Sequence, residues 1–231
     1  MVRGELEDDF HRFGVTVRLD GATVVAVEGD GQRYPWTTCP TAVEPLHALA
    51  GARVTTALSA LGEHAEARQN CTHLFDLSGL AIAHAARNDA AIRIYDVAIP
   101  DRDGNRTTPA LWRDGTPVLR WDLAGRTIIG PEPFVDVSLR GGFLAWAEAT
   151  FDADLAEAAS VLRRACDISL GRFMDLDVFE TAEMLGDQVR GTCHSFQPEM
   201  MVQAVRVKGQ TRDFTDDADA LLDQGRHEPS G

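Results

Sequence analysis

Apolar and polar residues alternate near the start of the chain in a way that predicts a β-hairpin. Every second residue over 13–19 is apolar, which is the periodicity of a strand with one buried face. Asp20-Gly21 is a turn signal, and residues 22–28 are typical of the returning strand. We expect a third strand over residues 33–38, which ends at Cys39-Pro40.

Helical periodicity follows the hairpin. Thr41 is a candidate cap for a short helix that ends before Gly51, and a second helix is expected over residues 54–61. A third helix is predicted from Asn70 or Cys71 to about Arg87, because its apolar residues recur at helical spacing.

Strand patterns return in the second half of the chain. Residues 91–99 alternate, and segments 109–112 and 118–123 flank the turn signal Asp114-Gly115, so they predict a second hairpin. Residues 141–171 are strongly helical, and Asp152 or Asp154 is the candidate N-cap.

These patterns predict an α+β fold with two antiparallel patches separated by helices. No linker of low complexity interrupts the chain. We expect an α+β half over residues 1–90, a second α+β part packed against it over 91–215, and a frayed polar tail over 216–231. The edge strands of the second patch invite pairing, so we expect a homodimer.

The composition is that of an ordinary globular protein with an acidic charge. The 231 residues carry a formal net charge of −14, which argues against partners that are polyanions, namely nucleic acids and anionic membranes. No run of residues is apolar enough to span a membrane, and the acidic N-terminus does not resemble a signal peptide. The four cysteines are therefore expected to be reduced, and the protein cytoplasmic.

Cysteine and histidine residues gather at the predicted element boundaries. Cys39 lies where a strand gives way to a helix, and Cys71 and His73 open the third helix. A thiol at a helix N-terminus is stabilised as the thiolate, and a nearby histidine can act as a base or a metal ligand. Cys193-His194 is a further candidate. A single cysteine is more often core packing, as we expect for Cys166.

These motifs resemble those of a bacterial family labelled as a domain of unknown function. The resemblance rests on the stretch from His11 to Arg87 and on the later Cys193-His194-Ser195-Phe196. Within the stretch it is carried by Cys39-Pro40, Leu49-Ala50-Gly51 and Cys71-Thr72-His73-Leu74. It implies no established activity.

Residues 8–88 also distantly resemble iron–sulfur scaffolds of the NifU/IscU type. The resemblance rests on a hairpin, then Cys39, a helix, and Cys71 at the head of another helix. It implies a NifU/IscU-like N-terminal half with three converging ligands, in which His11, Cys39 and Cys71 take the three cysteine positions.

We weigh three functions on this basis. The first is a small-molecule catabolic enzyme, a lyase or hydrolase acting on a hydrophobic or aromatic substrate. Its catalytic candidates are Cys71, His73, His11 and Cys39, and its pocket candidates are Tyr34, Trp36, Cys193 and His194. The second is a protein that binds zinc or iron through Cys39, Cys71 and His11. The third is a non-catalytic ligand-binding module. No cofactor is favoured.

Overall fold

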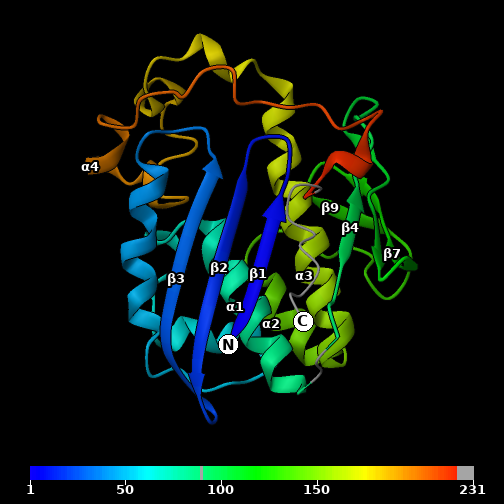
Figure 1. Ribbon diagram of the computed structural model, residues 1–231. Helices are drawn as coiled ribbons and strands as arrows, with labels where there is room; N and C mark the ends of the chain where they lie inside the picture. The colour runs from blue at the N-terminus through cyan, green and yellow to red at the C-terminus, as the bar shows by residue number, and fades with distance from the viewer. Residues whose placement is uncertain (89–90, 223–231) are drawn as a thin grey trace. The chain divides into compact units, whose positions relative to one another are not determined.

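The computed structural model describes residues 1–88 and 91–222 (Figure 1). The chain divides into two compact units. The first comprises Met1–Thr56, Ala60–Asn88 and the chain from Asp175 onward, and the second comprises Ala57–Ser59 and Asp89–Met174. Helices combine with antiparallel sheets in the described residues, so the predicted α+β class is confirmed.

The first unit is built on a three-stranded antiparallel sheet in the order β1-β2-β3. Its strands are β1 (Val2–Glu7), β2 (Arg12–Asp20) and β3 (Thr23–Arg33). The alternation over residues 13–19 is explained, because Phe13, Val15 and Val17 are buried in the core. The β2–β3 hairpin is therefore confirmed.

Two of the strand expectations need correction. The sequence did not indicate β1, which pairs with β2 along its whole length. The third strand expected over 33–38 was wrong, because β3 itself extends to Arg33 and Trp36 makes only an isolated bridge to Arg206.

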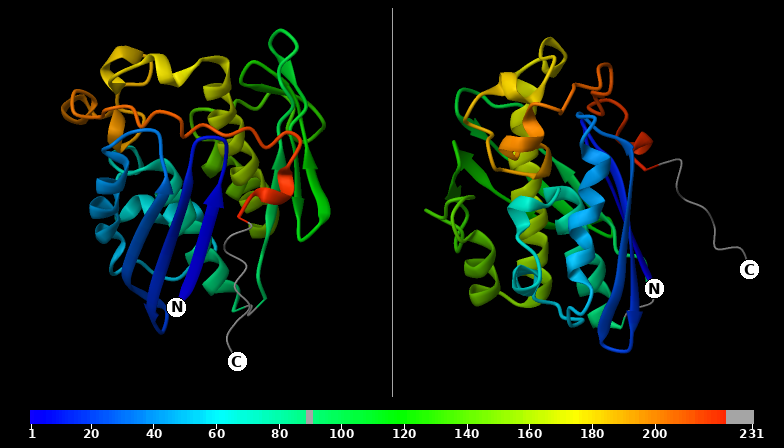
Figure 2. Two further views of the ribbon diagram at one scale, coloured as in Figure 1. Left: turned by 45° about the horizontal axis from the view of Figure 1, so that its top comes forward. Right: turned by 90° about the vertical axis from the view of Figure 1, so that its left-hand side faces the viewer.

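Two glycines let the helices approach the sheet closely. Gly4 and Gly29 both pair with Val15, one from each side. A Cβ atom would lie 3.1 Å from Leu77 at Gly4 and 3.0 Å from Val43 at Gly29. Leu77 belongs to α1 (Thr72–Arg87) and Val43 to the 3-10 helix η1 (Cys39–Leu49). The edge-on view in Figure 2 shows helical segments on one face of this sheet.

The helices of the first unit follow the predictions in part. Helix α1 is confirmed over nearly the predicted range. The helix expected from Thr41 is the 3-10 helix η1, which contains Pro45. The one expected over 54–61 is η2 (Leu58–Glu63), of which the residues from Ala60 onward belong to this unit. The remaining helical segments of this unit are η3 (Ala67–Gln69), η5 (Leu176–Val178), η6 (Ala182–Leu185), η7 (His194–Phe196), α4 (Pro198–Met201) and η8 (Ala218–Ala220).

The second unit has two small antiparallel sheets in its described part, in the orders β4-β6-β7 and β5-β8-β9. Their strands are β4 (Tyr95–Ala98), β5 (Arg106–Thr107), β6 (Ala110–Arg113), β7 (Thr116–Arg120), β8 (Asp122–Ala124) and β9 (Thr127–Gly130). The hairpin at Asp114-Gly115 is confirmed as β6–β7. The sequence did not indicate the β5-β8-β9 sheet.

The helical stretch predicted over 141–171 is three successive helices. These are α2 (Phe143–Thr150), α3 (Ala153–Ile168) and the 3-10 helix η4 (Ser169–Phe173). Asp152 separates α2 from α3, because its side chain accepts a hydrogen bond from the Leu155 amide and so caps a new helix. The core of this unit gathers Leu111, Trp121 and Leu162.

The C-terminal segment contacts β1 within its described part. The Leu222 amide donates a hydrogen bond of 2.9 Å to Glu7 Oε2. Residues 223–231 of the tail predicted over 216–231 lie outside the described residues. Among those residues, no helix combines the length and the apolar character that crossing a membrane requires.

Candidate metal centre

The turn between β1 and β2 carries the first part of the site. Asp8 Oδ1 accepts hydrogen bonds from the amides of Phe10 at 2.8 Å and of His11 at 2.9 Å. The Asp8 amide in turn donates to the His11 carbonyl at 2.9 Å. This is the local turn that an aspartate side chain favours, and it places the Asp8 and His11 side chains together.

Arg33 holds the backbone of this turn from inside the protein. It is 7% exposed, and its guanidinium donates to the carbonyls of Asp8, Asp9 and His11. It also pairs with Glu7 at 3.1 Å. A guanidinium offers five donors in a fixed geometry, so one buried side chain fixes three carbonyls of the turn.

The first turn of α1 contributes His73 to the same place. His73 Nε2 lies 3.4 Å from Asp8 Oδ2, and His11 Nδ1 lies 3.0 Å from Oδ1 and 3.2 Å from Oδ2 of Asp8. The two imidazole rings are 3.9 Å apart between centroids. Three potential ligands from two separate elements therefore converge.

The spacing of these donors suits one metal ion. One ligand atom from each of Asp8, His11 and His73 lies within 4.8 Å of the other two, and no other group of this kind occurs in residues 1–88 and 91–222. Nitrogen and oxygen ligands about 2.0–2.2 Å from a tetrahedral zinc ion are about 3.3 Å apart. Oδ1 of Asp8 is occupied by backbone amides, which leaves Oδ2 between the two rings.

The electrostatics of the cluster favour a charged carboxylate. Burial raises the pKa of Asp8, but the charge and the hydrogen bond of His11, together with the nearby His73, outweigh burial and hold this pKa well below its usual range. His73 Nε2 is buried and has no hydrogen-bond partner within the described part of the chain. An ionised carboxylate beside an unsatisfied ring nitrogen is a donor set ready for a cation.

Aromatic side chains enclose the cluster. His11 stacks on Phe13 with centroids 5.5 Å apart and meets the edge of Phe10 at 6.2 Å. The side chain of Asp8 is 23% exposed, against 12% for His11 and 6% for His73. Of the three, Asp8 is the side chain that solvent reaches most.

The predicted thiols lie beside this cluster but do not belong to it. Cys71 Sγ is 3.9 Å from His73 Nδ1, on the side of the ring away from Asp8. Cys39 Sγ is 3.4 Å from Ser195 Oγ. Burial raises the pKa of the Cys39 thiol, although a hydrogen bond with Ser195 opposes the shift. The sequence predicted that His11, Cys39 and Cys71 would form one ligand set. In the structure His11 lies with Asp8 and His73, whereas Cys39 lies with Ser195, so this set does not form.

Cys193 approaches Cys71 through a backbone contact. The His194 amide donates to the Asn70 carbonyl at 3.0 Å, so the residues next to this bond, Cys193 and Cys71, are neighbours. Burial raises the pKa of the Cys193 thiol, and Cys71 and Cys39 add to the shift. Three segments therefore converge, namely residues 38–39, 70–73 and 193–195. Because the pKa values of Cys39 and Cys193 are raised, both thiols are protonated at neutral pH.

The residues expected to line a substrate pocket have structural partners. Trp36 is 3% exposed and packs edge-on against Phe196, and Tyr34 packs against the same core. His194 Nε2 lies 2.9 Å from Thr41 Oγ1. These contacts account for their positions without a ligand.

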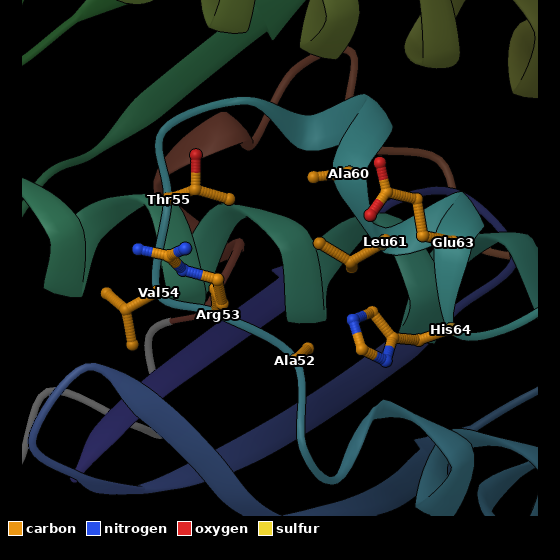
Figure 3. Close-up of a pocket in the computed structure, with 8 residues that line it drawn as sticks. All are labelled: Ala52, Arg53, Val54, Thr55, Ala60, Leu61, Glu63 and His64. Atoms are coloured by element: carbon orange, nitrogen blue, oxygen red, sulfur yellow. The ribbon is translucent and has the colours of Figure 1, made fainter.

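A hollow of about 320 Å³ lies elsewhere in the first unit (Figure 3). Arg53, Glu63 and His64 are its charged or titratable lining residues. Asp8, His11 and His73 do not line this hollow, so the metal-ligand cluster and the hollow are separate features.

Sequence reasoning identified both histidines of the cluster and missed Asp8. An available signal was the Asp-x-x-His spacing of Asp8 and His11 directly before a predicted strand, since an aspartate that opens a turn brings the third residue after it into contact. Arg33 and Ser195 carried no such local signal, because their partners are distant in sequence.

Comparison with known proteins gives a family for the N-terminal segment. Residues 4–87 match a family described as "Protein of unknown function (DUF2889)", which confirms the resemblance to a domain of unknown function over that segment. The match contains Asp8, His11 and His73. No curated protein and no solved structure matches the chain, so the NifU/IscU resemblance stays a prediction.

Proposed function

We propose that the protein is a metal-dependent enzyme of hydrolase or lyase type, with a divalent ion held by Asp8, His11 and His73. The observation that carries the proposal is the convergence of one carboxylate and two imidazoles at the separations that a single ion requires. This proposal combines the enzyme hypothesis with the metal-binding hypothesis. Asp8 and His73 replace Cys39 and Cys71 as the ligands beside His11.

The donor set favours zinc or ferrous iron. Two histidines and one carboxylate leave coordination positions open, as in catalytic zinc sites and in non-haem iron sites. A bound ion would polarise a carbonyl or activate a water molecule. Arg33 would keep the two ligands of the turn in position, and Phe10 and Phe13 would exclude bulk water from the ligands.

The substrate we propose is a small hydrophobic or aromatic molecule. Phe10 and Phe13 give the cluster an apolar surround, and an apolar wall with a few polar groups is the usual character of a small-molecule site.

Metal titration tests the proposal. The metal-stripped protein should bind one equivalent of Zn²⁺ or Co²⁺, and Asp8→Asn and His73→Ala should each weaken binding by more than the roughly 10–100-fold that loss of an outer-shell partner costs. His47→Ala, at an exposed histidine of η1, is the matched control and should leave the affinity unchanged. Equal affinity in all four proteins would contradict the proposal.

Turnover of small aromatic esters and lyase substrates distinguishes an enzyme from a binding module. We expect turnover that chelation abolishes and added Zn²⁺ or Fe²⁺ restores. Stoichiometric metal binding without turnover across such a panel would favour the non-catalytic module.

A metal-free acid–base site is the second candidate. Its support is the 3.0 Å contact of His11 Nδ1 with Asp8 Oδ1, since a carboxylate that orients an imidazole is the usual partner of a general base. In that case turnover would survive chelation. If Cys71 then acts as nucleophile, Cys71→Ser would abolish turnover without lowering the melting temperature.

We also propose that the protein is cytoplasmic and that it forms a homodimer. Cys39, Cys71, Cys166 and Cys193 are all free thiols, which is compatible with a reducing compartment. Sedimentation at micromolar concentration tests the dimer.

A further inference from the structure

Cys71 occupies the position of an outer-shell partner to the proposed metal ligand His73. Cys71 is the N-cap residue of α1, and its side chain makes no capping hydrogen bond. It is 8% exposed, and its Sγ lies 3.9 Å from His73 Nδ1. The imidazole therefore has the thiol at one nitrogen and the Asp8 carboxylate at the other.

The two contacts of His73 are unequal in quality. The contact of Nε2 with Asp8 is 3.4 Å long and is not a well-aligned hydrogen bond, which leaves Nε2 buried and unsatisfied in the described part of the chain. The contact of Nδ1 with Cys71 falls within hydrogen-bond range for sulfur. A neutral imidazole carries one N–H and one lone pair, so a His73 that binds an ion through Nε2 carries its hydrogen on Nδ1, where it faces Cys71 Sγ.

We infer that Cys71 is a positioning residue that accepts the Nδ1–H hydrogen bond of His73 and thereby aims the Nε2 lone pair at the metal position beside Asp8 and His11. This inference rests on the proposed metal site. Histidine ligands almost always donate their other ring N–H to a partner that fixes tautomer and ring orientation, and loss of that partner typically weakens metal binding 10–100-fold. A sulfur atom has this role here because the N-cap residue of α1, Cys71, lies two residues before His73.

The inference also accounts for the separation of the thiols from the metal-ligand cluster. Cys71 is in contact with the ring of His73, while Cys39 is in contact with Ser195. Cys71 contacts Nδ1 of His73, whereas the metal would bind Nε2. The thiol is therefore not expected to coordinate the metal.

Two measurements on the full chain test the role of Cys71. The first is the tautomer of His73 in the metal-free protein, read from two-bond ¹H–¹⁵N correlations of the imidazole. The second is the Co²⁺ affinity with the visible spectrum of the complex. The variants are Cys71→Ala, Cys71→Ser and the matched control Cys166→Ala, a buried thiol of the second unit. Circular dichroism checks that each variant is folded.

We expect the Nδ1–H tautomer in the native protein and its loss in Cys71→Ala, with Co²⁺ bound about 10–100-fold more weakly. Cys71→Ser should retain the tautomer, because a hydroxyl also accepts a hydrogen bond, and Cys166→Ala should behave as the native protein. The native Co²⁺ complex should lack thiolate-to-metal charge-transfer absorption.

Each contrary result has a defined meaning. An Nε2–H tautomer in the native protein, or a Cys71→Ala variant with native tautomer and affinity, would overturn the inference. Thiolate charge-transfer absorption that disappears in Cys71→Ala would make Cys71 a ligand and overturn it too. If the native protein binds no metal while the tautomer still depends on Cys71, the hydrogen bond is upheld and the proposed function fails.

Discussion

At the scale of single residues, the two carboxylate oxygens of Asp8 have different roles, one in the β1–β2 turn and one in the proposed metal site. Oδ1 accepts two backbone amides and so shapes the turn, while Oδ2 lies between His11 and His73. Asparagine has nearly the same shape and could keep the turn through its carbonyl oxygen, but it would present an amide without charge to the cation. Asp8→Asn therefore separates the structural part of this residue from metal binding.

A second buried carboxylate, in the other unit, gives a prediction about pH. Burial raises the pKa of Tyr95, and the charge of Glu157, whose carboxylate accepts the phenol hydrogen bond at 2.6 Å, adds to it, so that the pKa reaches about 12 from a usual value of 10.0. The pKa of Tyr95 is higher in the folded protein than in the unfolded chain. The contribution of Tyr95 to folding stability is therefore fully present below about pH 10 and is lost as the pH rises from about 10 to about 12.

Tyrosinate absorbance measures this shift directly. The chain has two tyrosines, so the difference between the native protein and Tyr95→Phe isolates Tyr95. We expect the difference to titrate near pH 12, with unfolding stability falling over the same interval in the native protein alone. A Tyr95 component that ionises near pH 10 in the folded protein would contradict the geometry around Glu157.

His11 and His73 were predictable from the sequence because histidines next to element boundaries carry a local signal. Asp8 was not predicted, because one more acidic residue in an acidic N-terminus stands out only once its turn is known. Trp36 is the converse case. Its aromatic ring suggested a pocket, but its partner Phe196 is distant in sequence and makes it part of the core.

At the scale of elements, α1 and the β2–β3 hairpin were predictable because each buries one face and shows it in its periodicity. Strand β1 was not, since it is a half-buried edge strand whose charged residues find distant partners, such as Arg3 with Asp30 at 2.6 Å. The helical pattern over 141–171 is continuous in the sequence. Its division into α2 and α3 was not predicted, because it depends on one capping residue, Asp152.

Arg33 links the end of β3 to the turn that carries the ligands, and its replacement tests that link. Arg33→Met should destabilise the protein by about 1–3 kcal/mol, because it leaves three carbonyls of the turn without their buried donor, while Glu7 keeps its contact with Arg12 at 3.4 Å. It should also weaken metal binding, since Asp8 and His11 lie on the freed turn. Urea unfolding and Co²⁺ titration measure the two effects.

Arg18→Met provides the matched control. Arg18 also lies in the sheet and pairs with Glu28 at 2.7 Å, but both side chains are more than half exposed. Its loss should cost at most about 1 kcal/mol and leave metal affinity unchanged. If the two variants were equally stable, Arg33 would not organise the turn.

At the scale of the whole molecule, the chain has two units with separate cores. Asp8, His11, His73, Cys71 and Arg33 all belong to the first unit and to the segment that matches the family of unknown function. The proposed metal site therefore lies within the first unit. The second unit contributes its own buried network around Glu157 and Tyr95.

The most direct test of the metal site is anomalous diffraction at the zinc absorption edge from crystals of the zinc-loaded protein. The account predicts one strong peak about 2.0–2.2 Å from Asp8 Oδ2, His11 Nδ1 and His73 Nε2, with Cys71 Sγ facing His73 Nδ1 and outside bonding distance of the ion. A zinc-loaded crystal with no peak between these three side chains, or with the ion bound by Cys39 and Cys71 instead, would contradict it.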